Sequence, residues 1–269
     1  MSFCRRRVET IDAARLMLLL GILLVADGAP AWGDGPLPGI IGNDDRVLLE
    51  ERGPPWDAVG QVNIGGYRTS GQCTGTLVRP NLVITAAHCV VNSATGRAFP
   101  LNDIHFLAAV RSSENKGHST AACLRFPEGY PLAPAGETIP RPAGGKVPLS
   151  ALARDSAVIV LSDALEVEPA PLAGGVAAAS GLELTHVAYP GDRRFLPVVH
   201  NGCRLLEADP PFWFNDCDTH PGSSGGPVFV KENGTYQVAA IQVAAGGGRA
   251  NVALPLSEWA DLTEKASCP

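Results

Sequence analysis

Short β-type segments, separated by glycine, proline and asparagine, recur along most of the chain and constrain its fold more than any other feature. Gln61–Ile64 alternates polar and apolar residues, as a half-buried strand does. Residues 75–78 and 82–85 flank Arg79-Pro80-Asn81 and predict a hairpin. Further strands are predicted at 158–161, 183–189, 227–230 and 236–243, with Gly234 in the turn between the last two. Many short strands with frequent turn signals predict a sandwich or a barrel.

Two other segments depart from this pattern. Ser257 is placed to cap a helix over Glu258–Lys265, the one convincing helical pattern after the first 31 residues. Pro127–Pro148 is rich in proline and glycine and predicts an irregular surface loop.

The N-terminus has the layout of a secretory signal peptide. A basic start with Arg5, Arg6 and Arg7 precedes the apolar run Leu16–Ala26, and Ala29-Pro30-Ala31 offers small residues for cleavage. We therefore assign residues 1–31 to a signal peptide and expect a secreted or periplasmic protein without stable membrane insertion after cleavage. The run is too short for a spanning helix.

Cysteine content and charge narrow the function further. Six cysteines remain after the leader, and an even number in an exported chain predicts disulfides. The formal charge of −6 disfavours nucleic acid, which is bound through cationic contacts with phosphates. The sequence contains neither a Cys-x-x-Cys nor a His-x-x-x-His spacing, so no metal site is predicted, and no organic cofactor is indicated.

Three motifs suggest nucleophilic chemistry. Ser224 lies in a glycine-rich turn, 221–227, directly before the apolar strand 228–230. His88 ends the run Thr85-Ala86-Ala87-His88-Cys89, and Asp155 directly precedes a strand-like run. Glycines permit the turn geometry in which a serine stands clear and neighbouring N–H groups stay free for an oxyanion.

Cys73–Val78, followed by Val83–Cys89, resembles the chymotrypsin/trypsin-fold serine endopeptidases. The Asp155 strand and Gly222–Pro227 fit the same family in the same order, His, Asp, Ser. The resemblance implies an all-β fold of two six-stranded antiparallel barrels with a short C-terminal helix. We assign residues 40–269 to this peptidase domain, with an N-terminal barrel at about 40–150 and a C-terminal barrel at about 165–256.

The resemblance also assigns roles. Ser224 would attack a peptide carbonyl, His88 would transfer the proton, and Asp155 would orient the imidazole. The N–H groups of Gly222 and Ser224 would form the oxyanion hole. Ser223 is the neighbouring serine, His220 is interpreted as pocket wall, and Asp103 and Asp163 are rival acids that do not precede an apolar strand.

The resemblance pairs Cys73 with Cys89. Cys203–Cys217 is expected because both residues lie just upstream of the serine loop, which leaves Cys123–Cys268 by elimination.

Activation and specificity depart from trypsin, which has aspartate where this chain has Ser223. Ile40–Arg46 and Cys217-Asp218-Thr219 look more like the bacterial glutamyl-endopeptidase branch, so residues 32–39 are either a short propeptide or a linker. In the specificity pocket, formed by Asp218, Thr219 and Gln242, Asp218 either binds basic side chains or is structural. Gln242 stands where that branch has histidine, which weakens a preference for glutamate. The preferred side chain is left open.

The motifs predict an exported serine endopeptidase acting on proteins or peptides as a monomer. The alternative is a catalytically inactive binding protein on the same fold.

Overall fold

The structure is a computed structural model that describes residues 39–66, 71–134, 136–138, 149–264 and 267–268. The predicted signal peptide at 1–31, and the 32–39 segment apart from Gly39, lie outside these residues. Among the helices in the described ranges, none is long and apolar enough to cross a membrane.

Six antiparallel strands close into the first barrel. In spatial order these strands are β2 (Val59–Ile64), β3 (Gly71–Arg79), β4 (Leu82–Thr85), β9 (Ala157–Leu161), β8 (Gly117–Arg125) and β7 (Ile104–Ala108). The predicted hairpin is confirmed as β3 and β4, and the predicted apolar strand as the fully buried β9. Because β9 closes this barrel, the barrel extends beyond the expected boundary at about 150.

The second barrel also contains six antiparallel strands. They are β11 (Val198–Asp209), β10 (Glu183–Ala188), β13 (Pro227–Glu232), β14 (Thr235–Ala245), β15 (Asn251–Pro255) and β12 (Phe212–Asn215), and β12 pairs back onto β11. The N-terminal strand β1 (Val47–Leu48) adds to the outside of β11. The expected all-β fold of two six-stranded barrels is confirmed.

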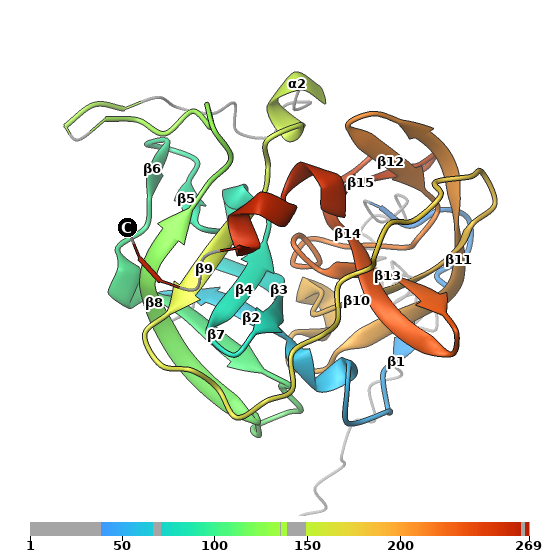
Figure 1. Cartoon of the computed structure of the whole chain (residues 1–269), viewed down its shortest axis with the longest axis horizontal. Coiled ribbons are helices and arrows are strands. Elements are labelled where there is room, and N and C mark those ends of the chain that lie inside the picture. The colour runs from blue at the N-terminus through green and yellow to red at the C-terminus, as the bar shows by residue number, and fades with distance from the viewer. Residues whose placement is uncertain (1–38, 67–70, 135, 139–148, 265–266, 269) are drawn as a thin grey trace, which may run out of the picture. The chain divides into compact units, whose positions relative to one another are not determined.

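The two barrels pack directly against each other within one compact unit, Leu37–Pro269. One core cluster runs through both, from Val62 in β2 to Phe229 in β13. The labels in Figure 1 show β2 to β9 on one side and β10 to β15 on the other. Gln61–Ile64 was expected to be half buried, yet all six residues of β2 are buried. Its outward face is covered, since the Gln61 amide donates to the carbonyl of Arg194.

Short helices and connections complete the chain. They are η1 (Trp56–Ala58), η3 (Ala87–Cys89), the two-stranded sheet β5 (Val91–Asn92) and β6 (Arg97–Ala98), η4 (Leu101–Asp103), α2 (Leu149–Leu152), η5 (Gly191–Arg193), η6 (Leu256–Glu258) and η7 (Ala260–Thr263). In the predicted Pro127–Pro148 loop, the described residues contain no helix or strand.

The C-terminal helix differs from the expectation. Instead of one α-helix capped by Ser257, two short 3-10 turns, η6 and η7, follow Pro255, and Ser257 makes no cap. Trp259 interrupts them with an extended φ of −145°. Its side chain is buried and its indole N–H donates to the carbonyl of Leu254 at 3.2 Å. Burial of this large ring therefore determines the local backbone.

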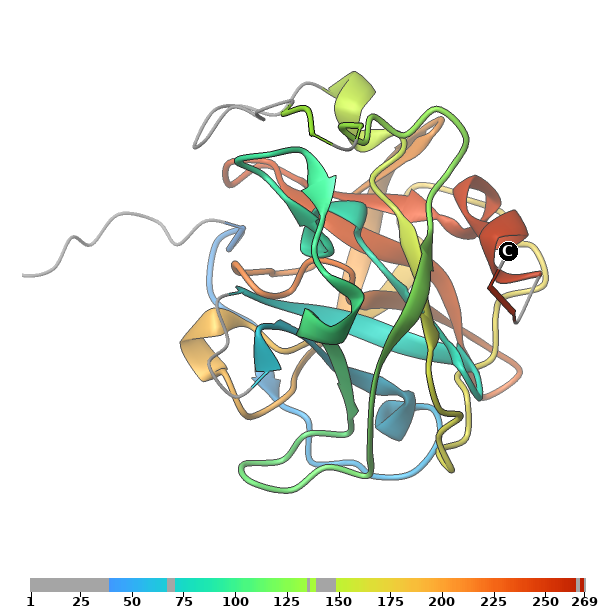
Figure 2. The same cartoon turned by 90° about the vertical axis from the view of Figure 1, so that its left-hand side faces the viewer.

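The tail then returns to the first barrel. Cys268 is bonded to Cys123 in β8, and Arg125 donates to the carbonyl of Leu262 at 3.2 Å. Figures 1 and 2 both show the C-terminus next to the first barrel. The tail thus links the two barrels covalently.

Candidate active site

Strand pairing brings His88 and Asp155 together. β4 and β9 are antiparallel neighbours, with Thr85 opposite Ala157. The chain that leaves β4 therefore meets the chain that enters β9. His88 lies in η3 just after β4, and Asp155 lies just before β9. Two residues 67 positions apart in the sequence become direct neighbours.

The contact between them has two points. The Nδ1 atom of His88 lies 2.6 Å from Oδ2 of Asp155, and the backbone N–H of His88 donates to Oδ1 at 2.8 Å. Asp155 is 3% exposed, whereas the His88 side chain is 36% exposed. A buried carboxylate that accepts at Nδ1 favours the tautomer with the proton on Nδ1 and a lone pair on Nε2.

The rival acids lie elsewhere. Asp163 follows β9 at its other end, and Asp103 ends η4; both are exposed. Of the three candidates, Asp155 is the one placed beside the imidazole of His88.

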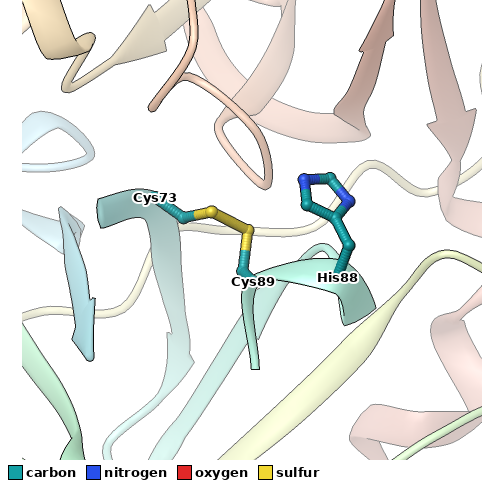
Figure 3. A group of neighbouring side chains, drawn as sticks. All are labelled: Cys73, His88 and Cys89. Atoms are coloured by element: carbon teal, nitrogen blue, oxygen red, sulfur yellow. A yellow bond between two sulfur atoms is a disulfide. The ribbon is translucent and has the colours of Figure 1, made fainter. Parts of the chain in front are cut away.

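A disulfide fixes the short helix that carries His88. Cys73 in β3 is bonded to Cys89, the residue after His88, across a sequence separation of 16. Figure 3 shows the imidazole projecting from η3 beside this bond. The two sulfurs and the ring nitrogen lie close enough to resemble a metal site. However, the disulfide leaves no thiolate to coordinate an ion.

The turn 221–227, which contains Ser224, packs against the same part of the first barrel, next to Cys73 and Cys89. The carbonyl oxygen of Ser224 accepts from the N–H of Thr74 at 2.9 Å and lies 3.7 Å from Sγ of Cys89. The hydroxyl of Thr74 donates to the carbonyl of Gly222 and accepts from the N–H of Tyr189, each at 2.9 Å. Thr74 therefore connects the first barrel to both sides of the turn. The sequence analysis gave it no role, although its position beside Cys73 was a usable signal.

Glycine is required at two positions of this turn. Gly225 has a φ of +79°, and a Cβ atom there would lie 2.2 Å from Oγ1 of Thr85. Gly222 has a φ of +100°, and its Cβ would lie 2.9 Å from the carbonyl oxygen of Tyr189. Both conformations are rare for residues with a side chain.

The two expected oxyanion donors have no acceptor. Among the described residues, neither the N–H of Gly222 nor that of Ser224 donates a hydrogen bond to the protein. The flanking N–H groups are engaged, since Ser223 donates to the carbonyl of His220 and Gly225 to that of Gln242. Free amides on both sides of Ser223 can bind a negatively charged oxygen.

A cleft of about 270 Å³ opens next to Ser224. Thr219, Gln242 and the wall Val243–Ala245 line it, with His220 and Pro221 completing the lining. Two of the three residues expected to form the specificity pocket, Thr219 and Gln242, line this cleft. Asp218 does not line this cleft.

Asp218 faces the N-terminal segment instead. Its Oδ1 accepts from the N–H of Ile41 and its Oδ2 from the N–H of Asp45, each at 2.8 Å. Its own N–H donates to Nδ1 of His200 at 2.8 Å, and the residue is 1% exposed. The position of Asp218 agrees with the structural alternative left open by the sequence.

We call residues 39–46 the strap, because they run along the back of the pocket wall. The carbonyl of Gly39 accepts from the N–H of Thr219 at 3.0 Å, and Arg46 bonds to Asp44 and Asp192 at 2.8 Å. The two carboxylates hold the pKa of the Arg46 guanidinium above its usual range despite burial. The sequence had singled out this segment without predicting its contact with Asp218.

The disulfides of the structure join Cys73 to Cys89, Cys123 to Cys268 and Cys203 to Cys217. These are the three pairs that the sequence analysis expected. The third bond joins Cys203 in β11 to Cys217, which follows β12 and directly precedes Asp218.

Comparisons with known proteins agree with this architecture. Residues 73–241 match the profile of the family described as "Trypsin-like peptidase domain". The curated "CLIP domain-containing serine protease B15" of Anopheles gambiae is 39% identical over 67 residues, which cover 23% of this chain and 18% of that protein. The matched part thus spans about a fifth of that relative's length.

Two solved structures share the fold. The structure of a Glu endopeptidase in complex with MPD has a TM-score of 0.64 and 20% sequence identity, covering 84% of this chain and all of that one. The VesB protease of Vibrio cholerae has a TM-score of 0.60 and 16% identity, covering 81% of this chain and 65% of that one.

Proposed function

The chain belongs to the trypsin-like peptidase domain family, and from this premise we propose that it is a serine endopeptidase that cleaves peptide bonds through Ser224, His88 and Asp155. Oγ of Ser224 attacks the substrate carbonyl, and Nε2 of His88 takes the hydroxyl proton. The resulting acyl-enzyme is then hydrolysed by water, with His88 again moving the proton. Proteins or peptides are the substrates.

The contact between His88 and Asp155 is the observation that carries this proposal. At 2.6 Å, the buried carboxylate accepts a hydrogen bond from Nδ1–H, orients the ring and stabilises its charged form during transfer. The backbone bond from His88 to the second oxygen leaves Asp155 little freedom to turn away.

The free amides of Gly222 and Ser224 support the second part of the mechanism. When the carbonyl becomes tetrahedral, its oxygen gains negative charge, and these two N–H groups would donate hydrogen bonds to it. Losing one such donor typically costs about 3 kcal/mol of transition-state stabilisation.

Hydrolysis of casein by the purified protein tests the activity. Wild type is expected to release soluble peptides, and Ser224→Ala or His88→Ala is expected to lower kcat roughly 10⁴-fold or more. Ser223→Ala is the matched control, since it removes the neighbouring hydroxyl and should retain most activity. If folded wild type releases no peptides after any N-terminal processing, the protein is a binding module on a peptidase fold.

We also propose that the enzyme is exported and acts as a monomer. Three disulfides support an oxidising compartment, as does the predicted signal peptide at 1–31. N-terminal sequencing of protein recovered from the culture medium or periplasm tests this proposal, and also tells whether residues 32–39 are removed.

A further inference from the structure

We propose that the cleft beside Ser224 accepts an uncharged side chain, and that Asp218 anchors the strap instead of recognising substrate. This inference rests on the proposed endopeptidase function. It assigns the preferred residue on the acyl side of the cleaved bond, which the sequence left open.

The cleft has the size and position for one side chain. Ser224 forms part of its lining, so a side chain bound there would place its own carbonyl at the nucleophile. Its volume of about 270 Å³ lies just under the ~300 Å³ of small ligand sites. Val243, Ala244 and Ala245 provide a small apolar wall.

Among the described residues that line this cleft, none carries a carboxylate. Asp218 is the acid closest to the lining in sequence, yet both of its oxygens accept strap N–H groups at 2.8 Å. Reaching the cleft would require breaking both of these part-buried hydrogen bonds, to the N–H groups of Ile41 and Asp45. A lysine or arginine side chain would therefore be desolvated without an opposite charge, which is strongly unfavourable.

The described lining residues offer no free positive charge to the cleft either. His220 is the one ionisable side chain in the lining, and its Nδ1 lies 3.7 Å from Oδ1 of Asp192 and 3.2 Å from the carbonyl oxygen of Pro221. The negative charge of Asp192, close to this imidazole, opposes an anion in the cleft. A glutamate side chain in the cleft would thus lack a partner.

The remaining polar groups suit uncharged substrates. Gln242 accepts from Asn215 at 3.3 Å and donates to the carbonyl of Ala244 at 3.1 Å, so its amide is oriented by the protein. The hydroxyl of Thr219 has no hydrogen-bond partner among the described residues. It can bond to an amide or hydroxyl, while the alanine wall favours aliphatic groups. Alanine, valine, leucine and glutamine are the side chains that fit this chemistry.

A set of fluorogenic peptides that differ only at the residue before the cleaved bond tests the inference. Peptides with alanine, valine, leucine or glutamine are expected to give a kcat/KM at least about 10-fold above those with glutamate, lysine or arginine. A preference for lysine or arginine would overturn the inference, and so would a preference for glutamate.

Labelling of Ser224 by a fluorophosphonate in the same samples distinguishes failure of the pocket assignment from failure of the proposed function. Labelled enzyme without the expected preference contradicts the pocket assignment alone. Folded protein that neither labels nor cleaves contradicts the proposed function and the inference with it.

Two variants test the role of each group. Ala245→Asp adds a carboxylate to the exposed rim of the cleft and is expected to raise kcat/KM for lysine and arginine peptides about 10-fold or more. Ala177→Asp, also exposed but outside the cleft, is the matched control and should change nothing.

Asp218→Asn should leave the order of side-chain preference unchanged while KM rises, because the strap loosens behind the wall. If instead this variant loses cleavage after lysine or arginine selectively, Asp218 contacts the substrate and the assignment is wrong. The Ala245→Asp comparison remains decisive if Asp218→Asn does not fold.

Discussion

Gly225 shows how the absence of one side chain affects the position of Ser224, the proposed nucleophile. Its φ is +79°, and a Cβ there would collide with Thr85 and Thr74. Because glycine has no Cβ, the turn can approach the first barrel closely. That approach carries the carbonyl of Ser224 to the N–H of Thr74. The position of Ser224 therefore depends on the close packing of the turn against the first barrel.

Gly225→Ala is expected to lower the free energy of unfolding by about 3 kcal/mol, because left-handed strain adds to overpacking. It should also displace Ser224 and lower kcat. Gly234→Ala is the control, since Gly234 has a φ of +82° but no atom within 4 Å of its Cβ position, so only the strain remains. Chemical denaturation of both variants measures the difference. Equal losses would show that the close approach contributes nothing.

Asp155→Asn is expected to lower kcat about 10⁴-fold with little change in KM, because the amide favours the wrong imidazole tautomer. The reason lies in the Nδ1 contact at 2.6 Å. Steady-state kinetics on one peptide substrate measure both constants. A reduction below about 10-fold would mean that Asp155 does not orient His88 during the reaction.

At the scale of elements, the sequence predicted strands well where apolar residues form a run. β9 and β13 are examples, since nearly every residue of their apolar cores is buried. It did not predict β8, whose half Gly117–Thr120 is mostly polar and pairs with β7, while the half Ala121–Arg125 pairs with β9. Such pairing is determined by distant parts of the chain, which local patterns do not contain.

The same limit applies to the pocket. The proposed triad residues could be singled out because each lies in a local motif. The orientation of Asp218 could not, since its partners Ile41 and Asp45 lie 177 and 173 residues away in the sequence. Only the folded chain shows which side of the wall the carboxylate faces.

Removing the disulfide next to His88 separates stability from catalysis. The double variant Cys73→Ala, Cys89→Ala opens a loop with a sequence separation of 16 and should lose about 3 kcal/mol. The double variant Cys203→Ala, Cys217→Ala opens one of 14 and should lose a similar amount.

At a temperature well below the melting temperatures of both double variants, only Cys73→Ala, Cys89→Ala is expected to lower kcat. The reason is that Cys89 neighbours His88, whereas the other two cysteines do not. Circular dichroism melts and kcat values measure the two effects. Equal kcat losses in both double variants would contradict a specific role for the Cys73–Cys89 bond.

At the scale of the whole molecule, a buried histidine in the second barrel links stability to pH. His186 is 2% exposed, its Nδ1 lies 3.0 Å from the carbonyl oxygen of Pro227, and its Nε2 has no hydrogen-bond partner within the described part of the chain. Burial lowers the pKa of His186 to about 4 from an ordinary value of 6.5. Between these values the unfolded chain binds the proton and the native protein does not.

Stability should therefore be independent of His186 above pH 6.5 and should fall as the pH drops toward 4, by up to about 3 kcal/mol. Urea unfolding at pH 7.5, 5.5 and 4.5 measures this fall. His186→Gln should show a shallower pH dependence, because its side chain does not titrate. An unchanged slope in the variant would assign the acid sensitivity to other groups.

The central claim is that Ser224 is a nucleophile activated by His88. Treating the processed protein with a fluorophosphonate and locating the adduct by peptide mass spectrometry tests this most directly. The account predicts a single adduct on Ser224, absent in Ser224→Ala and strongly slowed in His88→Ala. An adduct on Ser223, or no adduct on protein that unfolds cooperatively, would contradict it.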